Sequence, residues 1–274
     1  MPDQNTKTAA CAERFDAACK IIVDAGKLAL DYFERRGSLA IEMKTSGQDL
    51  VSAADRDVED FLRQAISARF PEDGLYGEEN GQKPGTSHYR WLMDPIDGTS
   101  CFLHGLQSWG VVIALFHQDT PVAGLIYEPC TGQLYTAKLG EGAHRNGTKI
   151  HVNDTTPFSG GFIAVGATRR EHGPHIGGLI AAVMANGGVY MRNGSAALSL
   201  AHVAAGHYLA YYEPVLNAWD CVAGLLIVSE AGGDVDDFPL SSDFSKKGPC
   251  LAGSAAAAEK LRDILGTLEM AAGG

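Results

Sequence analysis

Two segments in the first quarter of the chain carry apolar residues at helical spacing. One covers 9–35 and includes Phe15 and Ile22, and the other runs from about Ala53 to Phe70. Apolar residues at every third or fourth position predict amphipathic helices with one buried face. Residues 38–50 lose this spacing, which predicts a loop or a weak hairpin between the two helices.

Strand-like segments follow as far as about residue 152. A short strand over 75–79 ends in two acids, and a second over Tyr89–Met93 ends at Asp94. Three longer segments predict an antiparallel meander, over Ser108–His117, Pro121–Glu128 and Gly132–Lys138. The pair Asn146-Gly147 is a strong turn signal, which predicts a hairpin over 143–152.

Strands and helices alternate in the pattern after residue 153. The predicted strands cover 162–165, 189–192 and 209–212. The predicted helices cover 174–186, 195–205, 220–231 and 255–268, with Ser195 as an N-cap. This alternation is typical of an α/β layer with a buried sheet. We therefore expect two lobes that share one interface, an N-terminal α+β lobe over 1–152 and a C-terminal α/β lobe over 153–274.

Composition narrows the class of protein. The 274 residues are 45% hydrophobic, which is enough for a large core, and the net charge of −11 argues against a nucleic-acid partner. The six cysteines form no Cys-x-x-Cys pair, which argues against a zinc ribbon. The chain starts without an apolar signal core, and no apolar run reaches the ~18 residues that span a bilayer. We therefore expect a cytoplasmic protein with reduced thiols and no membrane segment.

The segment Trp91-Leu-Met-Asp94-Pro-Ile-Asp97-Gly-Thr99 carries the most chemical information. It presents two carboxylates three residues apart and then a hydroxyl, directly after an apolar strand. Carboxylate, carbonyl and water oxygens are the ligands that hard cations such as Mg²⁺ prefer. Protein Mg²⁺ sites commonly add substrate phosphate oxygens, so the segment favours phosphate chemistry.

Three further acids stand at the edges of apolar segments: Asp55, Glu78 and Asp220. A carboxylate beside buried apolar residues is costly unless it is paired or binds a metal. For Asp55 or Asp220 alone, a helix cap or a salt bridge is the competing interpretation. Few lysines or arginines lie near these acids in the sequence, so the group together favours joint metal binding.

No competing catalytic pattern of the Ser-His-Asp or Cys-His type is present in the sequence. His104, His151 and His172 have no evident partners and are interpreted as surface or structural residues. Cys101 lacks a paired base, so we do not expect it to act as a nucleophile.

Several further segments accompany Asp94–Thr99 in a recognisable order. They are Lys44 through Asp49-Leu-Val-Ser-x-x-Asp55, Gly77-Glu78-Glu79, Gly142-Ala-x-x-Asn146-Gly147, Trp219-Asp220-x-x-Ala-Gly224 and Glu230-Ala-Gly-Gly233. From about residue 10 to 260, this set resembles the inositol monophosphatase family. The resemblance implies an α+β or α/β fold, a layered αβαβα sandwich of the sugar-phosphatase type.

The resemblance also implies a role for each acid. Glu78, Asp94 and the Ile96 carbonyl would hold a first Mg²⁺, and Asp94, Asp97 and Asp220 a second. A third ion would rely on Glu78 and water, giving two to three ions in all. Thr99, with Glu78 or metal, would activate the attacking water, with Asp55 in support. The Gly98 and Thr99 amides would bind phosphate at a helix N-terminus, where free N–H groups favour anions, and Lys44 would belong to a mobile loop.

The same resemblance suggests where the substrate alcohol binds. Glu213 matches the acid that hydrogen-bonds ring hydroxyls, and Asp97 and Ala196 match positions that line the same pocket. A pairing of Glu213 with a surface cation is the competing interpretation. Asn217 stands where some relatives carry His, and Cys101 replaces the Asn that usually follows Thr-x, so the pocket rim and the local turn differ from the family pattern.

The expected function is a lithium-sensitive, Mg²⁺-dependent phosphomonoesterase acting on inositol monophosphate or a similar polyol phosphate. A histidinol-phosphate phosphatase is the first alternative, since Glu213 would also suit a cationic substrate. A regulatory protein that uses this scaffold to bind a protein partner is the second. The family resemblance favours a homodimer.

Overall fold

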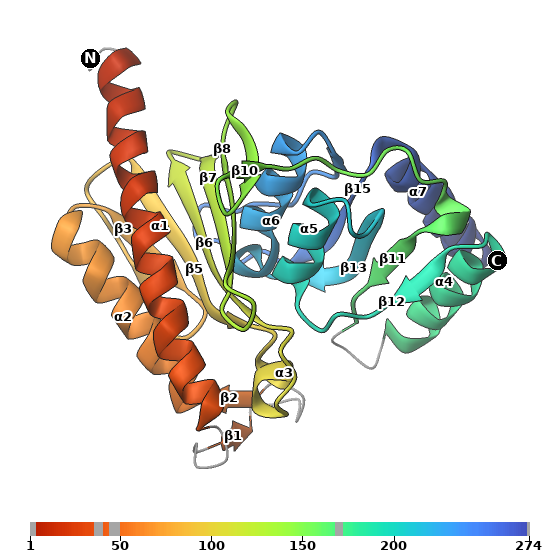
Figure 1. Ribbon diagram of the computed structural model, residues 1–274, viewed down its shortest axis with the longest axis horizontal. Helices are drawn as coiled ribbons and strands as arrows, with labels where there is room; N and C mark the ends of the chain where they lie inside the picture. The colour runs from red at the N-terminus through yellow and green to blue at the C-terminus, as the bar shows by residue number, and fades with distance from the viewer. Residues whose placement is uncertain (1–3, 36–40, 44–49, 168–171, 273–274) are drawn as a thin grey trace.

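The computed structural model describes residues 4–35, 41–43, 50–167 and 172–272. These residues form five layers in the order helix, sheet, helix, sheet, helix (Figure 1). Helices α1 (Gln4–Glu34) and α2 (Ala53–Arg69) cover the outer face of a large sheet. Helices α5 (Ala196–Ala204) and α6 (Ala218–Glu230) lie between the two sheets. The expected αβαβα sandwich is therefore confirmed.

The large sheet has eight strands in the order β10-β9-β8-β7-β6-β5-β3-β4. Their bounds are β3 Gly74–Gly77, β4 Gly81–Lys83, β5 Tyr89–Asp97, β6 Gly110–His117, β7 Thr120–Glu128, β8 Gln133–Lys138, β9 Gly142–Arg145 and β10 Thr148–Lys149. Strands β6, β7 and β8 pair antiparallel, so the predicted meander is confirmed, and β3 pairs with β5 in parallel. The sequence did not predict β4.

Strand β6 explains why its sequence is apolar at nearly every position. Val111 and Ile113 face the core under α1 and α2, whereas Val112 and Ala114 face the core beside α5 and α6. Because helices cover both faces of the sheet, successive side chains of one strand are buried on opposite sides.

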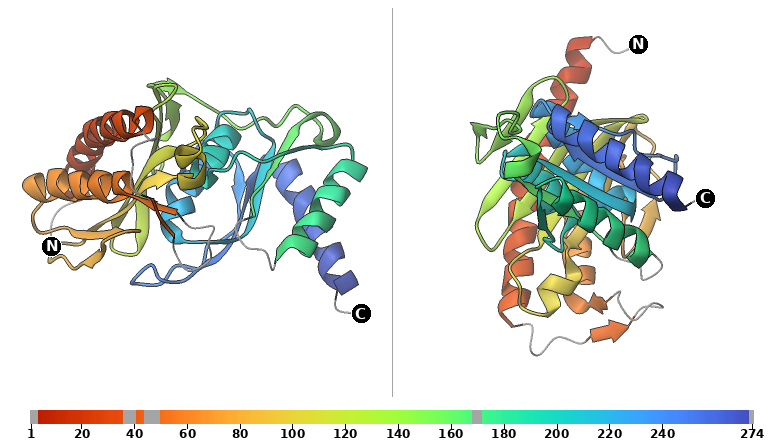
Figure 2. Two further views of the ribbon diagram at one scale, coloured as in Figure 1. Left: turned by 90° about the horizontal axis from the view of Figure 1, so that it is seen from below. Right: turned by 90° about the vertical axis from the view of Figure 1, so that its right-hand side faces the viewer.

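The small sheet has five strands in the order β12-β11-β13-β15-β14. Their bounds are β11 Phe162–Val165, β12 Val189–Met191, β13 Ala210–Leu216, β14 Asp234–Val235 and β15 Gly248–Gly253. Helices α4 (Gly173–Ala185) and α7 (Ala255–Ala272) cover its outer face, as Figure 2 shows from two further sides. The 3-10 helix η2 (Phe158–Gly160) precedes β11.

The sequence-based prediction of the strands in this half was wrong at one strand end and missed two strands. Strand β13 continues four residues beyond the predicted end at Tyr212. Strands β14 and β15 were not predicted, because β14 has two residues and β15 opens with Gly248-Pro249, which resembles a turn. Strand β15 lies antiparallel between β13 and β14, so only pairing with its neighbours makes it a strand.

The segment between α1 and α2 contains a two-stranded hairpin, β1 (Ile41–Met43) with β2 (Leu50–Ser52). The weak hairpin expected here is confirmed for these strands, whereas Lys44 lies outside the described residues. The division into lobes at residue 152 stays a prediction, and α5 and α6 from the second half pack against strands of both sheets.

Helix α6 reaches the large sheet through a backbone contact. A Cβ atom added at Gly124 of β7 would lie 2.5 Å from the carbonyl oxygen of Ala223. Only glycine allows this approach, so the backbone of the helix lies directly against the sheet.

The described helices include none that is long and apolar enough to cross a membrane. All six cysteines lie in the described part of the chain and are free thiols.

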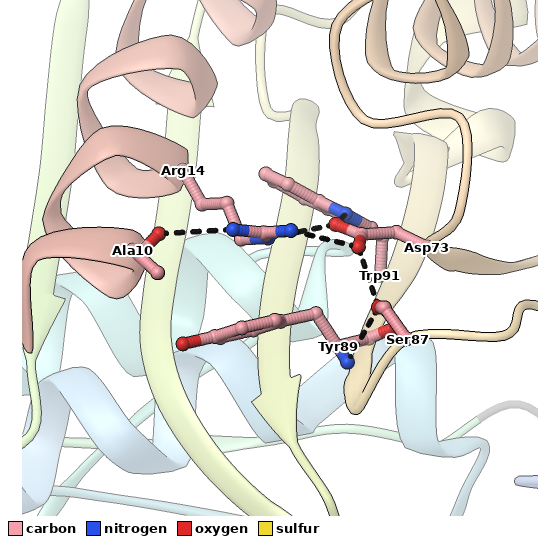
Figure 3. A network of polar contacts seen from close by, with 6 residues as sticks. All are labelled: Ala10, Arg14, Asp73, Ser87, Tyr89 and Trp91. Carbon is pink, nitrogen blue, oxygen red and sulfur yellow. Dashed lines mark hydrogen bonds and ion pairs between the residues drawn. The ribbon is translucent and has the colours of Figure 1, made fainter. Parts of the chain in front are cut away.

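A buried ion pair fastens α1 to the large sheet (Figure 3). The Arg14 guanidinium donates from Nε and Nη2 to the Asp73 carboxylate at 2.8 and 2.9 Å. Trp91 Nε1 and Ser87 Oγ donate to the same carboxylate at 2.8 and 2.6 Å. The Arg14 guanidinium carbon also lies 3.9 Å from the centre of the Tyr89 ring.

Asp73→Asn is expected to lower the free energy of unfolding by about 1.5–3 kcal/mol, because hydrogen bonds to a charged group contribute about that much. Urea unfolding followed by fluorescence measures it. Asp119→Asn is the control, since Asp119 pairs with Arg90 through a side chain that is 91% exposed. Equal stability of the two variants would contradict the importance of the buried pair.

Candidate active site

Three carboxylates from distant parts of the chain meet where β3, β5 and α6 come together. Glu78 follows β3, Asp94 lies in β5, and Asp220 lies in the first turn of α6. One carboxylate oxygen from each lies within 4.8 Å of the others. Asp94 is buried, and Glu78 and Asp220 are partly buried. In the described part of the chain, this is the one group of three acids, histidines or cysteines that could share a cation.

Two hydrogen bonds within the Asp94–Thr99 segment hold its oxygens in place. Strand β5 does not end at Asp94 as expected but continues to Asp97, with a shift of register against β6 between these two acids. A bulge accommodates Pro95, which cannot donate a ladder hydrogen bond. The Ile96 amide donates to Asp94 Oδ1 at 3.0 Å, and the Thr99 hydroxyl donates to the Ile96 carbonyl at 3.0 Å.

Gly98 makes the turn from β5 into the short helix α3 (Thr99–Leu103), which begins where the family resemblance implied a helix N-terminus. Its φ of 91° lies in the region that only glycine adopts readily, and an added Cβ would lie 2.8 Å from the carbonyl oxygen of Ser108. The amides of Gly98 and Thr99 therefore stand at the start of a helix, as expected for a phosphate contact.

Asp97 lies at the N-terminus of α5. Its Oδ2 accepts hydrogen bonds from the Ser195 hydroxyl and, at 2.8 Å, from the Ala197 amide. Ser195 also caps α5, because its hydroxyl accepts from the Leu198 amide at 3.0 Å. The predicted cap is confirmed, but its second role, holding Asp97, carries no sequence signal because the partners lie about a hundred residues apart.

The acids perturb one another electrostatically. Burial raises the pKa of Asp94 well above its ordinary value, and the charges of Glu78, Asp97 and Asp220 raise it further. Burial and the Asp97 charge raise the pKa of Asp220 to about 7, against hydrogen bonds from Asn217 that lower it. Burial raises the pKa of Asp97 to about 6, against the Ser195 and Ala197 hydrogen bonds.

This donor set fits a hard divalent cation. It consists of oxygen ligands that repel one another when charged, and a bound cation would relieve that repulsion. Glu78, Asp94, Asp220 and the adjacent Asp97 are the residues that could hold it.

Asn217 orients one of these acids. Asn217 is the N-cap of α6, and its backbone N–H and its side-chain Nδ2 donate to Asp220 Oδ2 at 2.8 and 3.0 Å. The sequence interpretation placed Asn217 only at the pocket rim. The three-residue spacing from an N-cap Asn to an acid is a local signal that could have revealed this pairing.

Asp55 is buried in the first turn of α2, and its charge contributes to the raised pKa of Asp94. It therefore lies beside the acid cluster. Its supporting role toward Thr99 stays a prediction.

Glu213 is a further buried acid near the cluster. It is buried on β13 and accepts a 2.6 Å hydrogen bond from the Tyr211 hydroxyl. Its charge raises the pKa values of Asp97 and Asp220, so it faces the same region. Gly166 makes room for it, since an added Cβ there would lie 1.9 Å from Glu213 Oε2. Ala196 opens α5 close to Asp97 and is buried.

The thiol of Cys101 is buried and points to the backbone. Its Sγ lies 3.8 Å from the Asn193 carbonyl oxygen, and burial raises the pKa of the thiol. A raised pKa disfavours the reactive thiolate, which agrees with a structural role. His104 contacts the Ser100 carbonyl at the exposed end of α3, outside the acid cluster.

Comparisons with known proteins identify the family of this chain. The model of the inositol monophosphatase family matches residues 11–268, and the chain belongs to that family. An inositol-1-monophosphatase of Mesorhizobium japonicum is 39% identical, with 84% of this chain and 87% of the relative covered. A histidinol-phosphatase of Chlorobaculum parvum is 37% identical (81% and 84% covered), and a Nus factor SuhB of Haemophilus influenzae 34% (83% and 86%).

A solved structure agrees with this placement. The extragenic suppressor protein suhB from Bartonella henselae superposes with a TM-score of 0.86 at 33% identity, covering 92% of this chain and 98% of that chain. The resemblance seen in the sequence motifs is therefore confirmed. Family membership and the names of the relatives support a phosphatase activity.

Proposed function

We propose that the protein is a Mg²⁺-dependent phosphomonoesterase that hydrolyses inositol monophosphate or a related polyol phosphate to the alcohol and phosphate. The observation that carries this proposal is the group formed by Glu78, Asp94 and Asp220, whose oxygens lie within 4.8 Å of one another. Phosphoryl transfer depends on positioning and on charge stabilisation, which a cluster of this kind serves when it holds a cation.

The proposed ligand sets are those that the family resemblance implies. Glu78, Asp94 and the Ile96 carbonyl would hold one Mg²⁺, and Asp94, Asp97 and Asp220 another, with a third relying on Glu78. Bound Mg²⁺ ions lower the pKa of water and stabilise the leaving oxygen. Family membership supports metal dependence, whereas the identity and number of the ions are part of the proposal.

The remaining residues would position the reactants. The Thr99 hydroxyl, with Asp55 behind it, would orient the attacking water, and the amides of Gly98 and Thr99 would hold the phosphate at the start of α3. Asp97 and Ala196 would line the pocket for the alcohol. Glu213, kept in place by Tyr211, would accept hydrogen bonds from vicinal hydroxyls of a polyol.

A panel of phosphate monoesters tests the proposal directly. The purified protein should release phosphate from inositol 1-phosphate faster than from histidinol phosphate, only with Mg²⁺ present and with inhibition by Li⁺. A higher kcat/KM on histidinol phosphate would favour the alternative that the Chlorobaculum relative suggests. Absence of turnover on every substrate by folded protein would contradict phosphatase function.

Glu213→Gln is expected to lower kcat/KM for the polyol phosphate by about 10- to 100-fold, since hydrogen bonds to a charged group contribute about 1.5–3 kcal/mol. Phenyl phosphate, which has no hydroxyls for Glu213 to bind, is the matched control substrate and should be hydrolysed at an unchanged rate. Equal losses on both substrates would assign Glu213 to phosphate chemistry or folding instead.

The SuhB relatives suggest a regulatory role as a second candidate function. A stoichiometric protein partner captured together with absent turnover would support it. The cytoplasmic location and the homodimer expected from the sequence stay predictions, and light scattering on the purified protein measures the second.

A further inference from the structure

We propose that Glu59 of α2 is a positioning residue that sets the metal affinity of the site by holding the turn that carries Glu78. The inference rests on the proposed function, because it concerns the same cation site. Glu59 was not singled out in the sequence.

The first observation is a pair of hydrogen bonds to the backbone of that turn. The amide of Glu79 donates to Glu59 Oε2 at 2.7 Å, and the amide of Asn80 donates to Oε1 at 3.0 Å. These two amides directly follow Glu78, so the carboxylate of Glu59 grips the chain immediately after the metal-binding position. Hydrogen bonds to an ionised acceptor are among the stronger ones in proteins.

The second observation is that Glu59 is itself held rigidly. Its side chain is fully buried, and Arg63 Nε donates to Oε1 at 2.6 Å. Arg63 also donates to the carbonyl of Gly81, on the far side of the same turn. One arginine therefore balances the buried charge and closes the turn from its other end.

The third observation is the close approach of the strand end. A Cβ atom added at Gly77 would lie 2.4 Å from Glu59 Oε1, so the backbone just before Glu78 rests against the same carboxylate. Glu59 thus contacts the chain on both sides of Glu78. On the next helical position, Asp60 accepts from Asn80 Nδ2 at 2.9 Å, which adds a further link between α2 and the turn.

A carboxylate ligand on a loose turn must be ordered when a cation binds, whereas one on a braced turn is already in place. Groups that support metal ligands in this way typically change affinity by about 10- to 100-fold when they are replaced. Glu59 reaches the ligand only through the backbone, so its effect should fall on cation binding more than on the chemical step.

Asp73 provides a matched control. Like Glu59 it is a fully buried acid paired with an arginine: the side chains are 0% exposed in both acids and 13–14% exposed in the two arginines. Asp73 precedes β3 and Glu78 follows it, so the two ion pairs brace opposite ends of one strand. Only the Glu59 pair grips the turn that bears a proposed ligand.

The experiment compares Glu59→Gln, Asp73→Asn and the wild-type chain. Mn²⁺ binding is followed by electron paramagnetic resonance without substrate, the Mg²⁺ dependence of phosphate release is titrated, and urea unfolding reports stability. For Glu59→Gln we expect about 10- to 100-fold weaker Mn²⁺ binding, a similar rise in the Mg²⁺ needed for half-maximal rate, and recovery of most of kcat at saturating Mg²⁺. For Asp73→Asn we expect lower stability with Mn²⁺ binding within about twofold of wild type.

Unchanged Mn²⁺ binding by folded Glu59→Gln, or equal weakening in both variants, would overturn the inference. If Glu59→Gln does not fold, Arg63→Gln takes its place: weaker Mn²⁺ binding supports the inference, and unchanged binding overturns it. Failure of the wild-type chain to bind Mn²⁺ and to release phosphate would instead refute the proposed function, and the role of Glu59 with it.

Discussion

Asp94→Asn is expected to reduce Mg²⁺-dependent phosphate release at least ~100-fold, which corresponds to a loss of about 2.7 kcal/mol of barrier lowering. Asp94 is the most buried of the three clustered acids, and it belongs to both the first and the second of the proposed ligand sets. An amide offers a neutral oxygen in place of a carboxylate, so the variant would lose charge toward both ions at once. Initial rates across a Mg²⁺ titration measure the effect.

Two controls separate this loss from unfolding. Asparagine keeps the side-chain oxygen that accepts from the Ile96 amide, so the local turn should persist, and the circular dichroism spectrum should not change. Asp119→Asn removes an acid whose side chain is 91% exposed, and its activity should equal that of the wild-type chain. Retention of more than about a tenth of the activity by folded Asp94→Asn would refute the proposed metal site.

The metal-free protein is expected to lose stability as the pH rises from about 4 to about 7. The pKa of Asp97 is raised from 3.8 to about 6 and that of Asp220 from 3.8 to about 7. In this window the folded state binds more protons than the unfolded state, so the free energy of unfolding falls with increasing pH. The loss of stability is absent at pH values below the pKa values of the unfolded state, and it is complete at pH values above those of the folded state.

The expected size is a few kcal/mol, or roughly 5–10 °C in the melting temperature of a chain this long. Thermal unfolding in EDTA from pH 4 to 8 measures it, with Asp220→Asn as the comparison because it removes one of the repelling charges. The variant should melt above the wild type at pH 8 and at the same temperature near pH 4. Mg²⁺ should raise the melting temperature of the wild type at pH 8 more than that of the variant. Parallel pH curves for the two proteins in EDTA would contradict this account.

The elements best predicted from the sequence are those specified by local pattern. Helix α2 and the β6–β7–β8 meander follow from apolar spacing, and the Ser195 cap of α5 follows from one hydroxyl before an apolar run. Strands β14 and β15 lack such a signal, because Gly248-Pro249 resembles a turn until its neighbours pair with it. The extension of β5 to Asp97 also depends on pairing, since the bulge that accommodates Pro95 exists only against β6.

The residues of the candidate site also differ in how far local sequence reveals them. Asp94 and Asp97 could be recognised from their spacing, because three residues of chain keep them near one another in any fold. The pair of Glu59 and Arg63 left a weaker signal, an acid and a base four residues apart on a helix, which is far more often a surface feature. Because the fold buries this pair against the turn that carries Glu78, the pair holds that turn in place.

By itself, the sequence determined the family and the candidate side chains: oxygen-bearing acids at the ends of apolar elements, in an order typical of one enzyme family. Only the tertiary structure decided which of them share a site. It brought Glu78, Asp94 and Asp220 together, set Asp97 against the α5 N-terminus, and set Glu59 behind the Glu78 turn. The physical reason is that the chain specifies local geometry over a few residues, whereas the distance between two distant carboxylates is set by how sheets and helices pack.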